Sequence, residues 1–190
     1  MMRPRGMARR AGRRFVVAVV VLVALAAIGG TSLVTAGQDQ LARVRASTDR
    51  FHTLAVANDA GYGEFYVCTD HVTDGTMGQH YVNLDLVLDT ATGVPSVDPL
   101  HPEALVYEPK INGGYRLVGV EYVVFQEAWD AVNDAPPVLF GKTFTPIPAG
   151  NRYSLPPFYE LHAWIWRPNP SGIFKDWNPK VSCRGNGDPA

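Results

Sequence analysis

The segment 158–166, Phe-Tyr-Glu-Leu-His-Ala-Trp-Ile-Trp, holds the densest group of side chains that can do chemistry in this chain. Its aromatic and aliphatic residues predict a β-strand, in which residues two apart share a face. One face would then carry a carboxylate, an imidazole and two indoles: Glu160, His162, Trp164 and Trp166. Such a face suits the lining of a ligand pocket with aromatic walls, or half of a metal site. The alternative is structural, with Glu160 and His162 paired to each other or to backbone groups beneath packed tryptophans.

Two further residues extend this to a metal site. His80 follows a glycine-rich turn in the segment 77–83, a position at the mouth of a sheet that suits a ligand. Glu121 lies in an apolar strand segment, where a charge must be paired, bound to a metal or turned to water; its neighbours Gly119 and Val123 favour the inside. If His80, Glu121 and His162 converge, they form a two-histidine, one-carboxylate set that suits Zn, Cu or Fe.

The N-terminal segment indicates export. Six arginines precede an unbroken apolar run over 15–28, and small residues follow at Val34-Thr-Ala36. This is the pattern of a signal peptide over residues 1–36. The uncharged stretch 15–37 is also long enough to span a bilayer if it is retained, so the alternative is an N-terminal membrane anchor. In both cases the domain, residues 37–190, lies outside the cytoplasm, either secreted or on the outer face of the cytoplasmic membrane.

The charge and the cysteines of the exported part constrain its class. Once the six arginines are removed, 11 Lys and Arg face 18 Asp and Glu, a net charge of −7. Such a domain lacks the basic face of a nucleic-acid binder. Cys68 and Cys183 are its two cysteines, and in an oxidising compartment we expect them to form a disulfide. A redox or metal thiol is the alternative, but no second cysteine stands at CxxC spacing.

The remaining pattern predicts an α+β fold. Apolar residues at helical spacing predict one helix over 38–60, with Phe51 in the centre of its apolar stripe. Residues 61–190 predict short strands, with a polar loop over 69–78 and a β-hairpin that joins 104–107 to 115–125 through Asn112-Gly-Gly114. We therefore expect the N-terminal helix to pack on a mostly antiparallel, twisted sheet or partly open barrel. The proline-rich tail after Arg167 should pack over this sheet before Cys183.

Several segments together resemble a family of exported bacterial proteins of unknown function. They cover nearly all of the exported chain: 59–62, 77–83, 102–109, 117–122, 160–166, 169–174 and 177–183. The resemblance implies secretion and a shared domain, and it assigns no catalytic role to any residue.

The function predicted from these features is a non-enzymatic module that binds a metal ion or a small ligand. The chain carries no GxSxG, HExxH, phosphate-loop, dinucleotide-binding or EF-hand pattern, so the sequence leaves open whether the protein is an enzyme. One alternative is a metal-dependent enzyme that uses the same residues. The other is a structural envelope or interaction protein. The predicted partners are a metal ion or small ligand, and a membrane if the N-terminal segment is retained.

Overall fold

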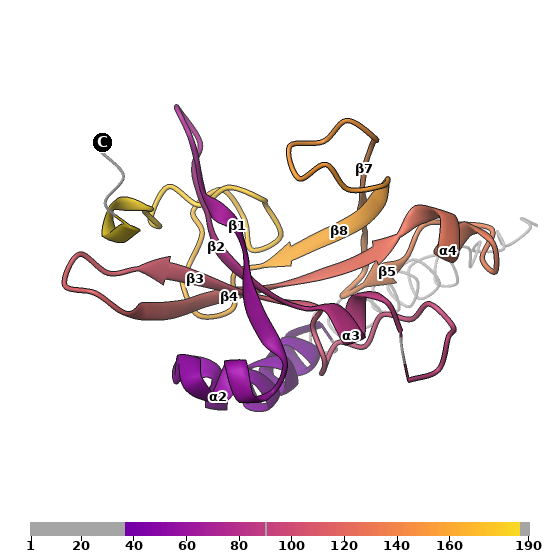
Figure 1. Ribbon diagram of the computed structural model, residues 1–190, viewed down its shortest axis with the longest axis horizontal. Coiled ribbons are helices and arrows are strands. Elements are labelled where there is room, and N and C mark those ends of the chain that lie inside the picture. The colour runs from indigo at the N-terminus through magenta and orange to yellow at the C-terminus, as the bar shows by residue number, and fades with distance from the viewer. Residues whose placement is uncertain (1–36, 90, 187–190) are drawn as a thin grey trace, which may run out of the picture. The chain divides into compact units, whose positions relative to one another are not determined.

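The computed structural model describes residues 37–89 and 91–186, and it shows the predicted α+β architecture (Figure 1). Residues 40–190 form one compact unit; in the preceding unit, 1–39, only residues 37–39 are described, and they are helical. The predicted signal peptide or anchor, 1–36, lies outside the described residues. Within the described part of the chain, no helix is long and apolar enough to cross a membrane.

A six-stranded antiparallel sheet forms the centre of this unit. Its strands are, in spatial order, β1 (Tyr62–His71), β2 (Gly75–Asn83), β3 (Ala104–Pro109), β4 (Tyr115–Phe125), β8 (Phe158–Ala163) and β7 (Thr145–Ile147). The sheet is strongly curled, and its edge strands β1 and β7 are not paired to each other, so it forms a partly open barrel (Figure 1). A small hairpin joins β5 (Val138–Leu139) to β6 (Lys142–Thr143), and α4 (Gln126–Asp130) follows β4 directly. The fold class predicted from the sequence is confirmed.

The N-terminal helical region packs on one face of the sheet, but it is not one helix. Residues 37–48 are α-helical, η1 (Asp49–His52) is a 3-10 turn, and α2 (Leu54–Asp59) follows. The helix predicted over 38–60 is interrupted because Thr53 is extended, with φ −97° and ψ 107°. At this point the hydroxyl of Tyr107 donates to the carbonyl of Phe51 at 2.7 Å, the carbonyl that a continuous helix would use internally. The hydrogen bond from Tyr107 of the sheet thus accounts for the interruption of the helix at Thr53.

The two faces of the sheet have different roles. One face is apolar and packs against the helical region through Leu105, Tyr107, Leu117, Val120, Tyr122, Val124 and Leu161. On the helical side, Phe51 is 3% exposed and its ring meets that of Tyr62 edge-to-face at 5.1 Å. Side chains on the alternate positions of the same strands point to the opposite face, where the candidate site lies.

The predicted loop over 69–78 was too long. β1 continues to His71 and β2 begins at Gly75, so the connection is a tight turn of three residues. The reason is the tail of the chain: Asn178 forms an isolated β-bridge with Thr76 that extends the hairpin. Gly75 has φ +101°, and a Cβ there would clash with the backbone of Asn178, so this close approach requires glycine.

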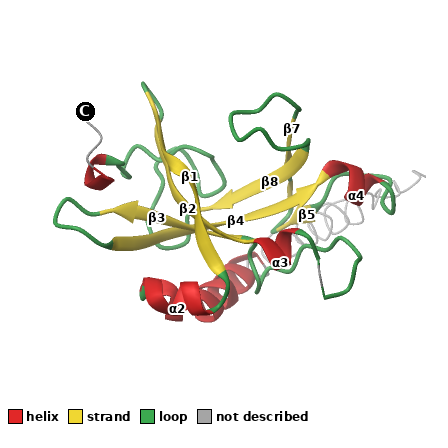
Figure 2. Cartoon of the chain, in the orientation of Figure 1, coloured by secondary structure: helices red, strands yellow, loops and turns green. Residues whose placement is uncertain are grey.

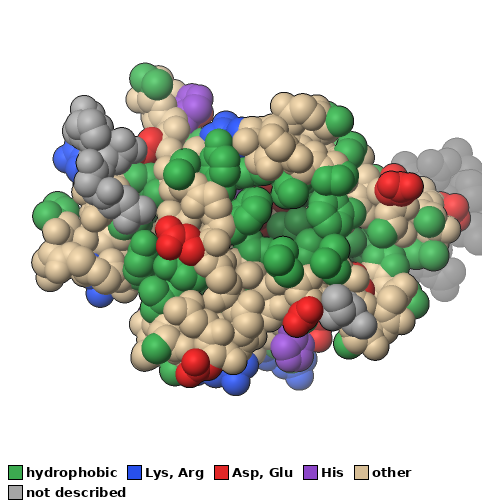
Figure 3. All heavy atoms as spheres, in the orientation of Figure 1, with side chains coloured by type: hydrophobic (Ala, Val, Ile, Leu, Met, Phe, Trp, Pro, Cys, Tyr) green, Lys and Arg blue, Asp and Glu red, His purple; other side chains and the backbone are tan. Residues whose placement is uncertain are grey.

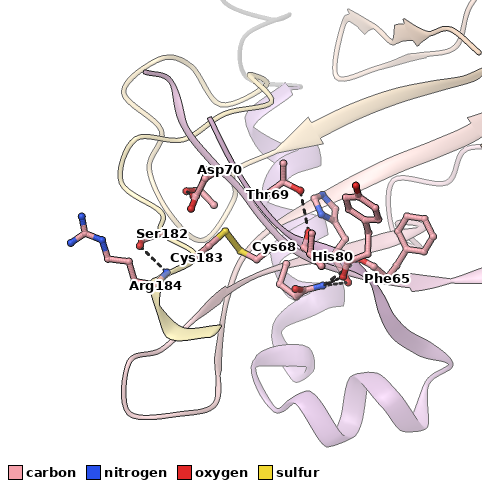
Figure 4. The surroundings of a disulfide bond; sticks show 12 residues. Phe65, Cys68, Thr69, Asp70, His80, Ser182, Cys183 and Arg184 are labelled. Atoms are coloured by element: carbon pink, nitrogen blue, oxygen red, sulfur yellow. Dashed lines mark hydrogen bonds between the residues drawn. A yellow bond between two sulfur atoms is a disulfide. The ribbon is translucent and has the colours of Figure 1, made fainter. Parts of the chain in front are cut away.

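The C-terminal tail packs down as predicted and ends in a disulfide. Figure 2 shows the chain after β8 running as loops toward the β1–β2 hairpin, and it finishes in η2 (Arg184–Asn186). Val181 and Cys183 are buried there. Cys183 is bonded to Cys68 of β1, with the two Cα atoms 5.6 Å apart and a sequence separation of 115 (Figure 4). The predicted disulfide is confirmed, and it fits an oxidising compartment.

We expect this disulfide to form in an oxidising compartment and to stabilise the tail. The variant Cys183→Ser should lower the free energy of unfolding by about 2–5 kcal/mol, because the cross-link restricts the unfolded chain. Urea denaturation measures this loss. As a control, a reducing agent should destabilise the wild type by a similar amount and leave the variant unchanged. Two reactive thiols per chain in unfolded, unreduced wild type would contradict the prediction.

The burial of Phe51 gives a second prediction. Phe51→Ala should cost about 3–5 kcal/mol of unfolding free energy, since a large core side chain is lost from the junction of helix and sheet. The control is Val56→Ala on α2, where the side chain is 37% exposed and the cost should stay below about 1 kcal/mol. Equal, small effects of both variants would show that the helical region only spaces the domain from its N-terminal segment.

Candidate metal centre

Three separate strands bring the predicted metal ligands onto one face of the sheet. His80 comes from β2, Glu121 from β4 and His162 from β8. Glu121 and His162 are direct cross-strand partners, and Ala104 of β3 is the partner of Glu121 on its other side. His80 stands opposite Val106, two residues further along β3. Its imidazole reaches across β3 to the other two side chains.

Small residues make room for this convergence. Ala104, the β3 partner of Glu121, is fully buried and contributes only a methyl group between β2 and β4. At Gly119, a Cβ would lie 2.9 Å from the carbonyl oxygen of Ala163 and 3.5 Å from the ring of Trp164. Glycine there lets Trp164 lie low over β4, with its ring stacked near that of His162 at 6.1 Å and 20°. The tryptophan thereby closes one side of the site.

The three functional groups lie close together in the interior, and two of their three contacts are at hydrogen-bond distance. The Nε2 atoms of His80 and His162 are 3.1 Å apart, and Nε2 of His80 lies 3.2 Å from Oε2 of Glu121. Nδ1 of His162 is 3.6 Å from Oε1 of Glu121, too far for a good hydrogen bond. His80 and Glu121 are each 7% exposed and His162 is 1% exposed. The structure therefore brings together all three residues singled out as metal ligands from the sequence.

Hydrogen bonds within this cluster do not give every buried polar atom a partner. A neutral imidazole has one N–H and one acceptor nitrogen, so only one histidine can donate across the 3.1 Å contact between the two Nε2 atoms. Nδ1 of His162 is buried and has no hydrogen-bond partner. Buried polar atoms rarely lack a partner. One ligand atom from each of the three residues lies within 4.8 Å of the other two, so the three side chains are close enough to share one metal ion.

The surroundings shift the pKa values of His162 and Glu121 toward the forms that bind metals. Burial lowers the pKa of His162, although the nearby carboxylate of Glu121 opposes this, so the imidazole is kept neutral. Burial by itself would raise the pKa of Glu121, but His162, His80 and hydrogen bonds together lower it below its ordinary value. Two neutral imidazoles and one carboxylate are the ligand forms required for coordination.

A second carboxyl group supports Glu121. Glu160 is 3% exposed and makes a side-chain hydrogen bond with Glu121. Burial and the neighbouring charge of Glu121 raise the pKa of Glu160, so Glu160 carries the proton of this pair and donates it to the Glu121 carboxylate. Glu160 was predicted to line a ligand pocket, and it does border a cavity, a polar one that is separate from the cavity beside His80 and Glu121.

Asp176 is a nearby acidic residue that the sequence analysis did not single out. It lies in the tail and, with Glu160 and His162, forms a second group of possible ligand atoms within 4.8 Å of one another. No spacing motif connects it to the strands. The one sequence feature that could have indicated its position is the group of apolar residues in the tail, which predicts that the tail packs back over the sheet.

Trp164 and Trp166 line a cavity together, as predicted, but it is not the cavity that borders His80 and Glu121, and Glu160 lines a different one. Trp164 packs with Val106, Val118 and Val181, and its indole N–H donates to the carbonyl of Lys175. Trp166 lies on the other face, where its ring meets His52 of η1 at 4.4 Å. The face alternation fails because β8 ends at Ala163, whose carbonyl accepts the N–H of Ile165 in a tight turn at 2.9 Å. Beyond that turn the strand periodicity no longer applies.

Two cavities border the cluster on either side of Tyr153. The first has a volume of about 110 Å³ and reaches His80 and Glu121; its other walls are apolar or aromatic, namely Phe65, Val82, Leu84, Val87, Leu88, Val123, Phe125, Tyr153, Leu155 and Phe158. Figure 3 shows a hollow rimmed by hydrophobic side chains on this face, between α3 (Leu84–Val87) and the loop that joins β7 to β8. The second cavity, of about 330 Å³, is polar and includes Arg152, Glu160 and Asp176.

Comparison with known proteins adds no identity to this arrangement: the chain matches no family model, no curated protein and no solved structure.

A third buried acid next to the site gives a pH prediction. Oε2 of Glu103 accepts the N–H of Val123 at 3.1 Å where β3 begins, and burial raises the pKa of Glu103 well above 4.5. The unfolded chain loses this proton near pH 4.5 while the folded protein keeps it, so the wild type loses stability as pH rises through that window. The loss is up to about 1.4 kcal/mol for each pH unit.

Glu103→Gln should remove this loss, because the amide stays neutral and its oxygen still accepts from Val123. Urea denaturation at pH 4, 6 and 8 measures the slope. Glu127→Gln, on an exposed position of α4, is the control and should keep the slope of the wild type. A slope that Glu103→Gln leaves unchanged would contradict the prediction.

Proposed function

We propose that this protein is an exported module that binds one transition-metal ion through His80, Glu121 and His162. The convergence of these three buried side chains at 3.1 to 3.6 Å carries the proposal. The residue types and strand positions in the sequence favour the same chemistry. The buried Nδ1 of His162, which has no hydrogen-bond partner, supports the proposal further. An ion bound in the cluster would change which nitrogen of each histidine carries a proton.

The donor set narrows the choice of metal. Two imidazole nitrogens and one carboxylate oxygen suit Zn, Cu or Fe, whereas Ca and Mg prefer oxygen ligands throughout. Three protein ligands leave at least one coordination position free. Because His80 and Glu121 line the apolar cavity, that position would face it.

Export is part of the proposal. The arginine-rich, apolar N-terminal segment, the Cys68–Cys183 disulfide and the acidic exported chain support a place in the secreted fraction or on the outer face of the membrane. Membership of the family of exported bacterial proteins that the chain resembles would agree with this location.

A metal-dependent enzyme is the second candidate, and one observation favours it. Glu160 is a buried carboxyl group beside the proposed ligand Glu121, and burial together with the charge of Glu121 raises the pKa of Glu160. Such an acid can deliver a proton next to a metal-bound water or substrate. Glu160→Gln would remove the acid and preserve the hydrogen bond to Glu121, so it separates a catalytic role from a supporting one in any assay that detects activity.

Isothermal titration with Zn²⁺ and Cu²⁺ tests the metal site. The wild type, first dialysed against a chelator, should bind one ion per chain. Glu121→Gln and His80→Gln should weaken binding by more than about 100-fold, since even outer-shell changes cost 10–100-fold. His162→Ala should do the same, with circular dichroism to establish that each variant is folded.

His101→Ala is the matched control, because His101 is an exposed histidine paired with Asp98 away from the site. It should bind like the wild type. Equal affinity in all these proteins, or no binding by the wild type, would refute the metal site and leave the cluster as a structural pair of histidines around a carboxylate.

A further inference from the structure

The cavity beside the proposed metal centre is built for an apolar occupant. Its volume is about 110 Å³, and apart from His80 and Glu121 its walls are apolar or aromatic. None of the described residues that line it is Lys or Arg. Two leucines at its mouth, Leu84 and Leu88, are 61% and 57% exposed. An apolar rim continuous with an apolar cavity extends the surface that a ligand would cover.

The charge at the inner end of the cavity indicates what kind of head group the ligand would have. A divalent ion held by one carboxylate and two neutral imidazoles carries a net charge of +1 in a buried place. A buried net charge is costly unless it is compensated. Because no cation other than the ion borders the cavity among the described residues, a monoanionic head group there would be held by the metal and would neutralise it.

We propose that the site takes a short apolar carboxylate, with the carboxylate on the metal and the hydrocarbon chain in the cavity; this rests on the proposed metal site. A cavity of about 150 Å³ holds a benzene molecule, so one of about 110 Å³ takes a chain of a few carbons. Longer chains would extend past Leu84 and Leu88 into solvent.

A chain-length series in the Zn²⁺-loaded protein tests the proposal. Isothermal titration with acetate, butyrate, hexanoate and octanoate should show an affinity that rises by up to about fourfold for each buried methylene and then levels off when the cavity is full. Metal-free protein should bind hexanoate at least about 100-fold more weakly. Affinity that does not depend on chain length, or hexanoate binding that is equal with and without Zn²⁺, would overturn the proposal.

A pair of matched variants separates the cavity from the metal. Leu155→Trp fills the cavity from the loop between β7 and β8, away from the strands that carry the ligands, and should reduce hexanoate affinity to that of acetate. Leu100→Trp adds the same bulk at an exposed position outside the cavity and should behave as wild type. Both should keep the Zn²⁺ affinity of the wild type. Equal hexanoate binding by the two variants would overturn the role of the cavity.

Different results would refute the metal site and the carboxylate ligand. If the wild type binds no Zn²⁺, the metal site is refuted and the carboxylate proposal falls with it. If Zn²⁺ binds in the expected 1:1 ratio but the carboxylate series is flat, only the ligand is refuted.

Discussion

The carboxylate of Glu121 lies in the middle of a β-sheet with 7% of its surface exposed, and it could not stay ionised there without partners. Strands on both sides supply them: His162 from the neighbouring β8 and His80 from β2, two strands away. Glu160 adds a proton donor. The charge of Glu121 therefore constrains the pairing register of β2, β3, β4 and β8. A slip of one residue would turn Glu121 to the opposite, apolar face.

That opposite face provides the stability that the site itself does not. Its apolar side chains pack against the helical region, and the hydroxyl of Tyr107 connects the sheet to the turn at Phe51. A polar cluster in a protein interior contributes little net stability even when it is well paired. One face of the sheet forms the apolar core and the other carries His80, Glu121 and His162. The chain can therefore hold this cluster without weakening its core.

The cover of the site comes from segments with no regular structure. The tail crosses the sheet, pairs with β2 through Asn178 and is fixed at its end by the disulfide to β1. On the way it places Asp176 near His162 and the carbonyl of Lys175 over Trp164. The loop between β7 and β8 supplies Tyr153, which separates the apolar cavity from the polar one. The disulfide thus stabilises the walls of the site as well as the fold.

The sequence alone determined the features that depend on local geometry. Turn residues at Asn112-Gly-Gly114 fixed the hairpin and the bounds of β4, and strand alternation placed Glu121 and His162 on inward positions. Two cysteines behind an N-terminal segment with the pattern of an export signal were enough to predict the disulfide. The tertiary structure decided which strands are neighbours: it set Glu121 opposite His162 and carried Asp176 to them. It also ended β8 at Ala163, which turned Trp166 to the other face, and it broke the helix at Thr53. The physical reason is that the direction of a side chain follows from its own backbone, whereas its partner depends on pairing between segments far apart in the chain.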